Sequence, residues 1–143
     1  MRAGIGIMAL ALAACGGGSG EGLDTSGQPL STGGGAPLAP TLASIQVNIF
    51  SVSCAISGCH GGGTVQFGLS LDAGLSAGNL INVASPQDAT LIRVIPGNPG
   101  GSFLIQKLEG TQTVGVRMPE GGPYLTQATI NVIRQWIQNG APP

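Results

Sequence analysis

Charged and aromatic side chains are scarce in this chain of 143 residues, and that scarcity excludes several classes of function. Only 8% of the residues are charged and 3% are aromatic, and the formal net charge at pH 7 is −1. With no basic patch and no phosphate-binding loop, the sequence gives no support to nucleic-acid or nucleotide binding. The apolar run near the N-terminus is far shorter than the roughly 20 residues that a membrane-spanning helix needs.

Histidine is also scarce, because His60 is the only one in the chain. Asp72 and Glu120 have no carboxylate or histidine near them in sequence, so we interpret them as caps or surface groups. No nucleophile and base pair remains once His60 has another role. The sequence therefore predicts a protein that is not an enzyme.

The most informative segment runs from Cys54 to His60, where two cysteines enclose four residues and the single histidine follows the second cysteine. Two thiols can add across the two vinyl groups of a haem, and the adjacent histidine is then placed to bind the iron from one face. The usual spacing is Cys-x-x-Cys-His, and four intervening residues form a less common variant. We predict one covalent haem, attached through Cys54 and Cys59, with His60 on the iron.

Two other interpretations of this segment stay open. A local disulfide between Cys54 and Cys59 is geometrically feasible in an exported protein. A structural zinc site needs about four nitrogen or sulfur ligands, and this loop supplies three. Under either interpretation, the position of His60 directly after Cys59 is a coincidence.

The third cysteine has its own explanation at the N-terminus. A positive charge and a short apolar core precede Leu12-Ala13-Ala14-Cys15, which matches a bacterial lipobox. We expect residues 1–14 to be a lipoprotein signal peptide and Cys15 to carry acyl chains. The protein is then exported and lipid-anchored to a bacterial membrane, at the periplasmic or cell-surface face of the outer membrane.

The domain organisation follows from a change in composition. Residues 15–40 are rich in Gly, Ser and Pro and cannot bury enough surface to offset their chain entropy, so they predict a flexible tether. Residues 41–143 predict one mainly α domain with long loops and short extended segments. We expect helices over residues 41–53, 72–80, 102–108 and 126–139, an extended segment over 65–71 and a short buried segment over 91–95. The expected N-caps are Thr41 or Ser44, Asp72, Ser102 and Thr126.

A second iron ligand is indicated by elimination. After signal-peptide removal Met118 is the only methionine, and it lies in the Gly- and Pro-rich loop of residues 117–123. Such a loop has little reason to carry a long apolar side chain unless that side chain packs or binds inward. We predict the Met118 thioether on the iron, with core packing as the alternative. Lys107, Tyr124 and a water molecule are weaker candidates for this position.

Two arginines are candidates for contact with the haem carboxylates. A guanidinium matches a carboxylate bidentately, so Arg93 and Arg117 are candidate partners of a haem propionate. A solvated surface charge is the alternative for each, and it is favoured for Arg117.

These features together resemble a small monohaem c-type cytochrome of the class I-like bacterial kind, carried in a lipoprotein. The resemblance covers residues 44–141: a helix leading into the Cys-x4-Cys-His loop, a Met-Pro loop, and a last helix with an inward Trp136. It implies a cytochrome c-like helical fold around one haem c, with Met118 as the distal ligand. It also implies that the first and last helices pack together, so that Ile49 or Phe50 meets Trp136.

The predicted function is a membrane-tethered carrier of single electrons, with redox proteins as partners. Six-coordinate iron favours electron transfer over substrate binding, and a thioether opposite histidine raises the reduction potential. One alternative is a haem-based gas sensor or peroxidase-like enzyme in which Met118 is labile. The other is a haem-free, disulfide-closed lipoprotein that acts as an adhesin or assembly module. The sequence leaves the oligomeric state open.

Overall fold

The structure is a computed structural model that describes residues 37–63 and 65–143. The predicted signal peptide, Cys15 and most of the predicted tether lie outside these residues, and the expectations for them stay predictions. Among the residues that are described, no helix has both the length and the apolar character needed to cross a bilayer.

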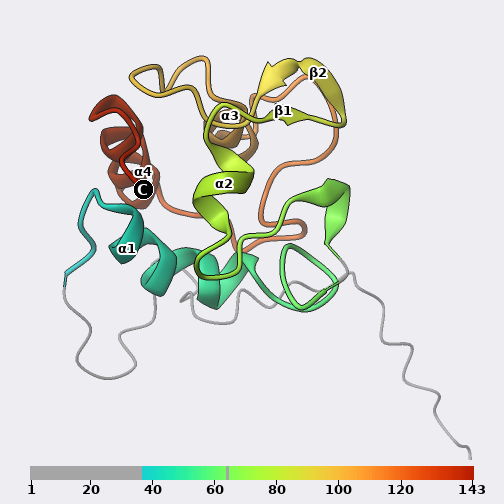
Figure 1. The fold of residues 1–143 in the computed structure, drawn as a ribbon, viewed down its shortest axis with the longest axis horizontal. Helices are drawn as coiled ribbons and strands as arrows, with labels where there is room; N and C mark the ends of the chain where they lie inside the picture. Colours follow the sequence, from blue (N-terminus) through green and yellow to red (C-terminus); the bar gives the residue numbers. More distant parts are fainter. Residues whose placement is uncertain (1–36, 64) are drawn as a thin grey trace, which may run out of the picture.

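Helices and a small sheet make up the described chain (Figure 1). The α-helices are α1 (Leu42–Ile45), α2 (Ser76–Leu80), α3 (Phe103–Glu109) and α4 (Gln127–Gln138). A π-helix (Gln46–Cys54) continues α1, a 3₁₀ turn covers Gln66–Gly68, and β1 (Ala84–Ser85) pairs antiparallel with β2 (Asp88–Ile92). Helices of all kinds hold 38% of the described residues and extended pairing holds 10%. The mainly α prediction is therefore only partly correct, because the fold is mixed.

The first predicted helix, over residues 41–53, is present, and Thr41 rather than Ser44 is its cap. The Thr41 hydroxyl accepts the Ser44 N–H at 3.3 Å. Beyond α1 the helix widens, and the N–H of Ala55 donates to the carbonyl of Phe50 at 2.6 Å, five residues back instead of four. Such π turns occur frequently at functional sites. Apolar spacing predicts a helix here, but it does not determine the hydrogen-bond register.

The predicted extended segment over residues 65–71 is wrong. A 3₁₀ turn lies there, with Phe67 in the left-handed region (φ 52°) and 55% exposed. The alternating apolar residues do not share one buried face, because Phe67 is exposed whereas Leu71 is buried in the core. Instead, the Phe67 carbonyl accepts a hydrogen bond from the Arg93 guanidinium at 2.8 Å, which holds the turn against the body of the domain.

The helix predicted over residues 72–80 starts later than expected, at Ser76, and Asp72 is not its N-cap. The Asp72 carbonyl accepts the N–H groups of Leu75 and Ser76, so the residue begins the turn that precedes α2. Its carboxylate instead accepts hydrogen bonds from the Gly62 N–H at 3.3 Å and the Ser70 hydroxyl at 3.1 Å. Asp72 thereby joins this turn to the loop that follows His60.

The predicted buried segment over residues 91–95 begins in the strand β2 and continues into the buried core. Its first residues belong to β2, and Arg93 and Val94 after them are buried. Val94 forms a parallel bridge with Ile81, which ties the sheet to the end of α2.

The two C-terminal helices agree with the prediction. Thr126 caps α4 by accepting the Thr129 N–H at 3.2 Å, and α3 ends at Gly110 with φ 79°. Ser102 precedes α3, but its hydroxyl donates to the Asn98 carbonyl and fixes the incoming turn rather than the helix end.

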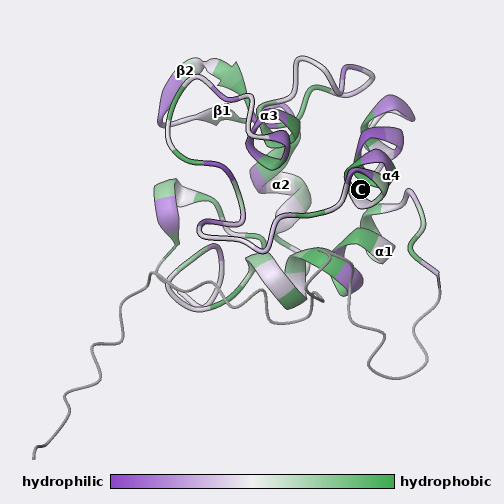
Figure 2. Cartoon of the chain, turned by 180° about the vertical axis from the view of Figure 1, so that it is seen from behind, coloured by the Kyte–Doolittle hydropathy of each residue, from purple (hydrophilic) through white to green (hydrophobic). Residues whose placement is uncertain are grey.

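One buried apolar cluster joins these elements. In Figure 1 the α1 and π-helix segment runs along one side, and α3 and the sheet lie opposite. Figure 2 shows both hydrophobic and hydrophilic residues along α4, whose apolar positions are buried. The Trp136 indole N–H donates to the Pro142 carbonyl at 2.8 Å. The cluster consists of Leu42, Ile45, Ile49, Phe50, Leu71, Leu80, Val94, Ile105, Leu108, Leu125, Ile130, Ile133, Trp136, Ile137 and Ala141. Ile49, Phe50 and Trp136 are all members, and direct contact of Ile49 or Phe50 with Trp136 stays a prediction.

A bidentate ion pair links α3 to α4 and makes the acid stability of the domain testable. Arg134 donates to both carboxylate oxygens of Glu109, at 2.9 and 2.8 Å, and holds the pKa of Glu109 below its ordinary value. The stabilisation is present above the unfolded pKa of about 4.3 and is lost as pH falls through the lower folded value. The side chains are 33% and 19% exposed, so solvent screening limits the contribution to about 1 kcal/mol.

We therefore expect Glu109→Gln to lower the free energy of unfolding by up to about 1 kcal/mol at pH 7 and to weaken its fall below pH ~4. Urea unfolding at pH 7 and at pH 3 measures both effects. Glu120→Gln, which removes an exposed carboxylate, is the control. Equal acid sensitivity in wild type and Glu109→Gln would contradict the expectation.

Candidate functional site

The segment from Cys54 to His60 folds into a closed loop at the end of the π-helix. The His60 N–H donates to the Cys54 carbonyl at 3.1 Å, and the Cys59 N–H donates to the Ile56 carbonyl at 3.0 Å. These bonds turn the chain back on itself, so the two cysteines end on one small loop. The four-residue spacing is thus accommodated by hydrogen bonds within the loop.

Both cysteines carry thiols in this structure and are half-buried. Burial, and then the nearby charge of Cys59, raise the pKa of the Cys54 thiol to about 12. Cys54 is therefore protonated at neutral pH, and its reaction as a nucleophile requires deprotonation.

His60 is oriented by a backbone carbonyl nine residues further along the chain. Its Nδ1 lies 3.2 Å from the Leu69 carbonyl oxygen. Because a carbonyl only accepts, this contact assigns the proton to Nδ1 and leaves a lone pair on Nε2. Burial lowers the pKa of His60, and the charges of Arg93 and Lys107 lower it further, against the opposing effect of the Leu69 hydrogen bond. The imidazole is therefore neutral near pH 7, which is the form that binds a metal.

The residue after His60 has to be glycine. A Cβ on Gly61 would overlap the Ala55 carbonyl and would lie 2.7 Å from the Asp72 carboxylate. The run of three glycines after His60 is visible in the sequence, but the sequence does not show which of them is required. The structure shows that Gly61 lets the loop of residues 54–60 close, because only hydrogen separates its Cα from the Ala55 carbonyl.

This close approach predicts that Gly61→Ala destabilises the loop. We expect a loss of about 1–3 kcal/mol in the free energy of unfolding, as for other overpacked sites, and incomplete occupancy of any group attached there. The control is Gly78→Ala in α2, where a Cβ meets nothing within 4 Å and alanine favours the helix by about 0.5–1 kcal/mol. Urea unfolding of both variants measures the difference, and a Gly61→Ala protein as stable as wild type would contradict the steric argument.

A buried glutamine also supports the loop, and sequence reasoning missed it. Gln46 on the π-helix donates to the Leu71 carbonyl and the Ser51 hydroxyl, both at 2.9 Å, and accepts from the Ser76 hydroxyl at 2.6 Å. It joins the helix before the loop to the segment after it and to α2. Glutamine is usually exposed, so its residue type gave no signal, and only its place beside Ile45 hinted at burial.

Arg93 lies inside the domain, so its interpretation as a solvated surface charge is wrong. It is 6% exposed, and its two terminal nitrogens donate to the carbonyls of Asn79 and Phe67, each at 2.8 Å. Its positive charge contributes to lowering the pKa of His60. A guanidinium has five N–H donors, so two such bonds leave donors for an anion.

Met118 is half-buried and packs against the central cluster. Cys54 and Leu69 pack against the same cluster, and the Leu69 carbonyl orients His60. The loop of residues 54–60 and the loop of residues 117–123 therefore both pack against the same buried cluster. The Lys107 carbonyl accepts the Met118 N–H at 2.9 Å, and the Lys107 charge contributes to lowering the pKa of His60.

The remaining candidate ligands and contacts have other partners. The Arg117 guanidinium lies 4.0 Å from the centre of the Tyr124 ring and donates to the Leu108 carbonyl at 3.0 Å. The Lys107 ammonium donates to the Val114 carbonyl at 2.8 Å. These contacts give Arg117, Tyr124 and Lys107 structural roles in the loop around Met118.

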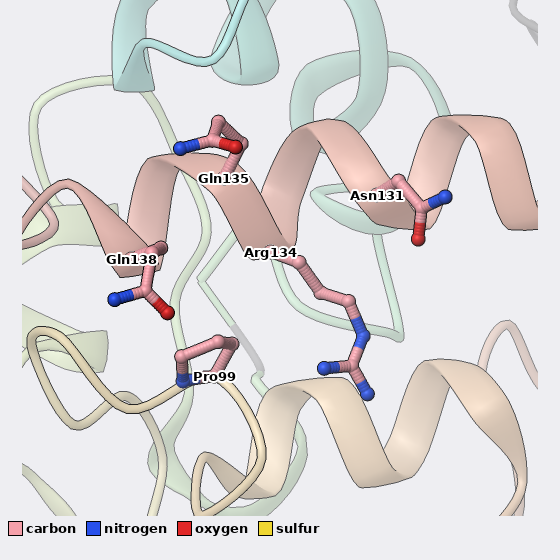
Figure 3. Close-up of a pocket in the computed structure, with 5 residues that line it drawn as sticks. All are labelled: Pro99, Asn131, Arg134, Gln135 and Gln138. Carbon is pink, nitrogen blue, oxygen red and sulfur yellow. The ribbon is translucent and has the colours of Figure 1, made fainter.

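Two surface hollows lie elsewhere on the domain. Figure 3 shows one, of about 260 Å³, with Arg134 extending from α4 toward α3; it is lined by Pro99, Asn131, Arg134, Gln135 and Gln138. The other, largely apolar, lies beside α1 and includes Pro37 and Val47. Neither contains a predicted site residue. Within the described ranges, no group of three or more His, Cys, Asp and Glu side chains is arranged to hold a metal ion.

No family model, curated protein or solved structure matches this chain. The donor set of residues 54–60 has the chemistry of a covalent haem site: two thiols on one loop and a neutral imidazole with Nε2 available. The Met118 thioether against the same core is a suitable second iron ligand.

Proposed function

We propose that this protein is a membrane-tethered monohaem c-type cytochrome that transfers single electrons. The observation that carries the proposal is the His60 geometry, in which Nδ1 contacts the Leu69 carbonyl at 3.2 Å beside two half-buried thiols. A disulfide or a surface loop gives no reason for the only histidine to be half-buried, neutral and oriented in this way. Cys54 and Cys59 would hold one haem c by thioether bonds, with His60 and Met118 as axial ligands.

When bound, the haem supplies one-electron iron chemistry, and the protein supplies its surroundings. The Leu69 carbonyl fixes the tautomer and ring direction of His60. The apolar cluster beneath Cys54 and Met118 excludes water. Arg93 and Lys107 place positive charge near His60, which would balance the carboxylates of a haem. A neutral thioether opposite imidazole raises the reduction potential.

The proposal includes export and anchoring through a lipidated Cys15. Its support is the lipobox of residues 12–15 and the Gly-, Ser- and Pro-rich composition of residues 15–40. A tether of about 25 residues has an r.m.s. reach of roughly 28 Å. The domain would then meet its redox partner proteins close to the membrane surface.

Production of the wild-type chain with a haem-attachment system tests the proposal. We expect the denatured chain to retain the mass of one haem, to stain for haem peroxidase activity, and to give a reduced-minus-oxidised difference spectrum. A wild-type product without haem, in which the two thiols form a disulfide, would instead support the adhesin or assembly alternative.

A further inference from the structure

Lys107 is the only lysine of the chain, and it is buried at 8% exposure. Lysine is almost never buried without a partner, because desolvation of an ammonium is costly. Here the ammonium donates to the carbonyls of Val114, at 2.8 Å, and Val116, at 3.3 Å. It also lies 5.0 Å from the centre of the Phe103 ring, within the range of a cation–π contact.

Both carbonyls belong to the loop that leads to Met118. The Lys107 main-chain carbonyl accepts the Met118 N–H at 2.9 Å, so one residue of α3 holds this loop through its side chain and its backbone. Gly115 lies between the two contacts with φ 69°. A Cβ there would overlap the Lys107 ammonium and would lie 2.9 Å from the Gln87 side-chain oxygen. The loop thus closes tightly over the ammonium.

We infer that Lys107 is a positioning residue for Met118, holding residues 114–118 on α3 so that the thioether is presented to the haem iron. The inference rests on the proposed function. Hydrogen bonds from a charged donor are among the stronger ones in proteins, and loss of the donor leaves two inward-facing carbonyls without it. The loop then loosens, and Met118 competes less well with an added ligand for the iron.

The test compares Lys107→Met and Lys107→Arg with wild type in the haem-loaded protein. Methionine keeps the length and apolar stem but removes the donors, whereas arginine keeps charge and donors. We expect Lys107→Met to weaken the sulfur-to-iron charge-transfer band and to raise carbon monoxide affinity at ferrous iron about tenfold, a typical coupling between two sites. Lys107→Arg should restore most of the wild-type band.

The control is Arg134→Gln, which removes a different cation bonded to α3. It should lower stability while carbon monoxide affinity stays within about twofold of wild type. A folded Lys107→Met protein with an unchanged band and unchanged affinity overturns the inference while leaving the proposed function intact. A wild-type protein without the band shows that Met118 is not a ligand, and the inference then falls with that part of the proposal.

A second measurement needs no variant. Because Lys107 is the only lysine, acylation of the tryptic peptide bounded by Arg93 and Arg117 reports its accessibility alone. At a carbon monoxide concentration high enough to displace Met118 slowly from ferrous iron, the loop should loosen, and Lys107 should be acylated about tenfold faster than in the carbon monoxide-free ferrous protein. Equal acylation rates in the two states overturn the inference, even if Lys107→Met fails to fold.

Discussion

Replacement of both Cys54 and Cys59 by serine is expected to abolish covalent haem attachment completely. Each thioether needs a sulfur that adds to a vinyl group, and the hydroxyl of serine is a far weaker nucleophile than a thiolate. The two sulfurs lie on one loop closed by the bond between His60 and Cys54. The denatured double variant should therefore lack the haem mass and should not stain for haem, whereas wild type should show both.

Cys15→Ser is the matched control, because it removes the third cysteine and leaves the pair intact. It should retain haem but lose the detergent partitioning expected of a lipidated protein, since several acyl chains anchor stably. Haem that stays bound through denaturation in the Cys54→Ser, Cys59→Ser protein would contradict the assignment of these two residues.

The second large effect is expected at Met118. Met118→Ala should keep the haem attached, remove the sulfur-to-iron charge-transfer band and open the iron to carbon monoxide. Loss of the thioether should lower the reduction potential on the order of 0.1 V or more, because axial ligands set potentials over about 0.8 V. Redox titration and ferrous carbon monoxide binding measure the two effects.

Met118→Leu separates ligation from packing. Leucine keeps a similar apolar volume, and such exchanges usually cost less than about 1.5 kcal/mol. If Met118 only fills space against the cluster, its leucine variant should keep the spectrum and potential of wild type. If Met118 binds the iron, the leucine and alanine variants should share the same spectral change. Rapid carbon monoxide binding to wild type itself would favour the gas sensor or peroxidase-like alternative.

The strength of local signals decided which parts of the fold were predictable. Gly110 ends α3 because glycine readily adopts the left-handed conformation, and Thr126 begins α4 because its hydroxyl can cap a helix. Both helices therefore lie where the sequence predicts them. The turn at Phe67 is held by Arg93, 26 residues away, and no local pattern encodes such a contact. The π-helix is a matter of hydrogen-bond register, which the apolar spacing over residues 41–53 does not specify.

The candidate site shows the same division. Its cysteines and histidine are recognisable because their residue types and spacing are rare. The groups that arrange them are ordinary: the Leu69 carbonyl, the space beside Gly61, and the amide of Gln46. A backbone carbonyl has no sequence signature, and a required glycine looks like any other glycine of a loop. These supporting groups become visible only when the chain is folded.

The burial of Trp136 gives the protein an internal optical reporter. It is the only tryptophan, is fully buried, and donates its indole N–H to the Pro142 carbonyl. Its fluorescence therefore reports on one site within the buried cluster to which α1, the π-helix, α3 and α4 all contribute. Unfolding exposes this indole to water and shifts its emission to longer wavelength. The haem proposed for this protein would quench the emission by energy transfer, so intensity would follow cofactor loading while wavelength follows core integrity in the same sample.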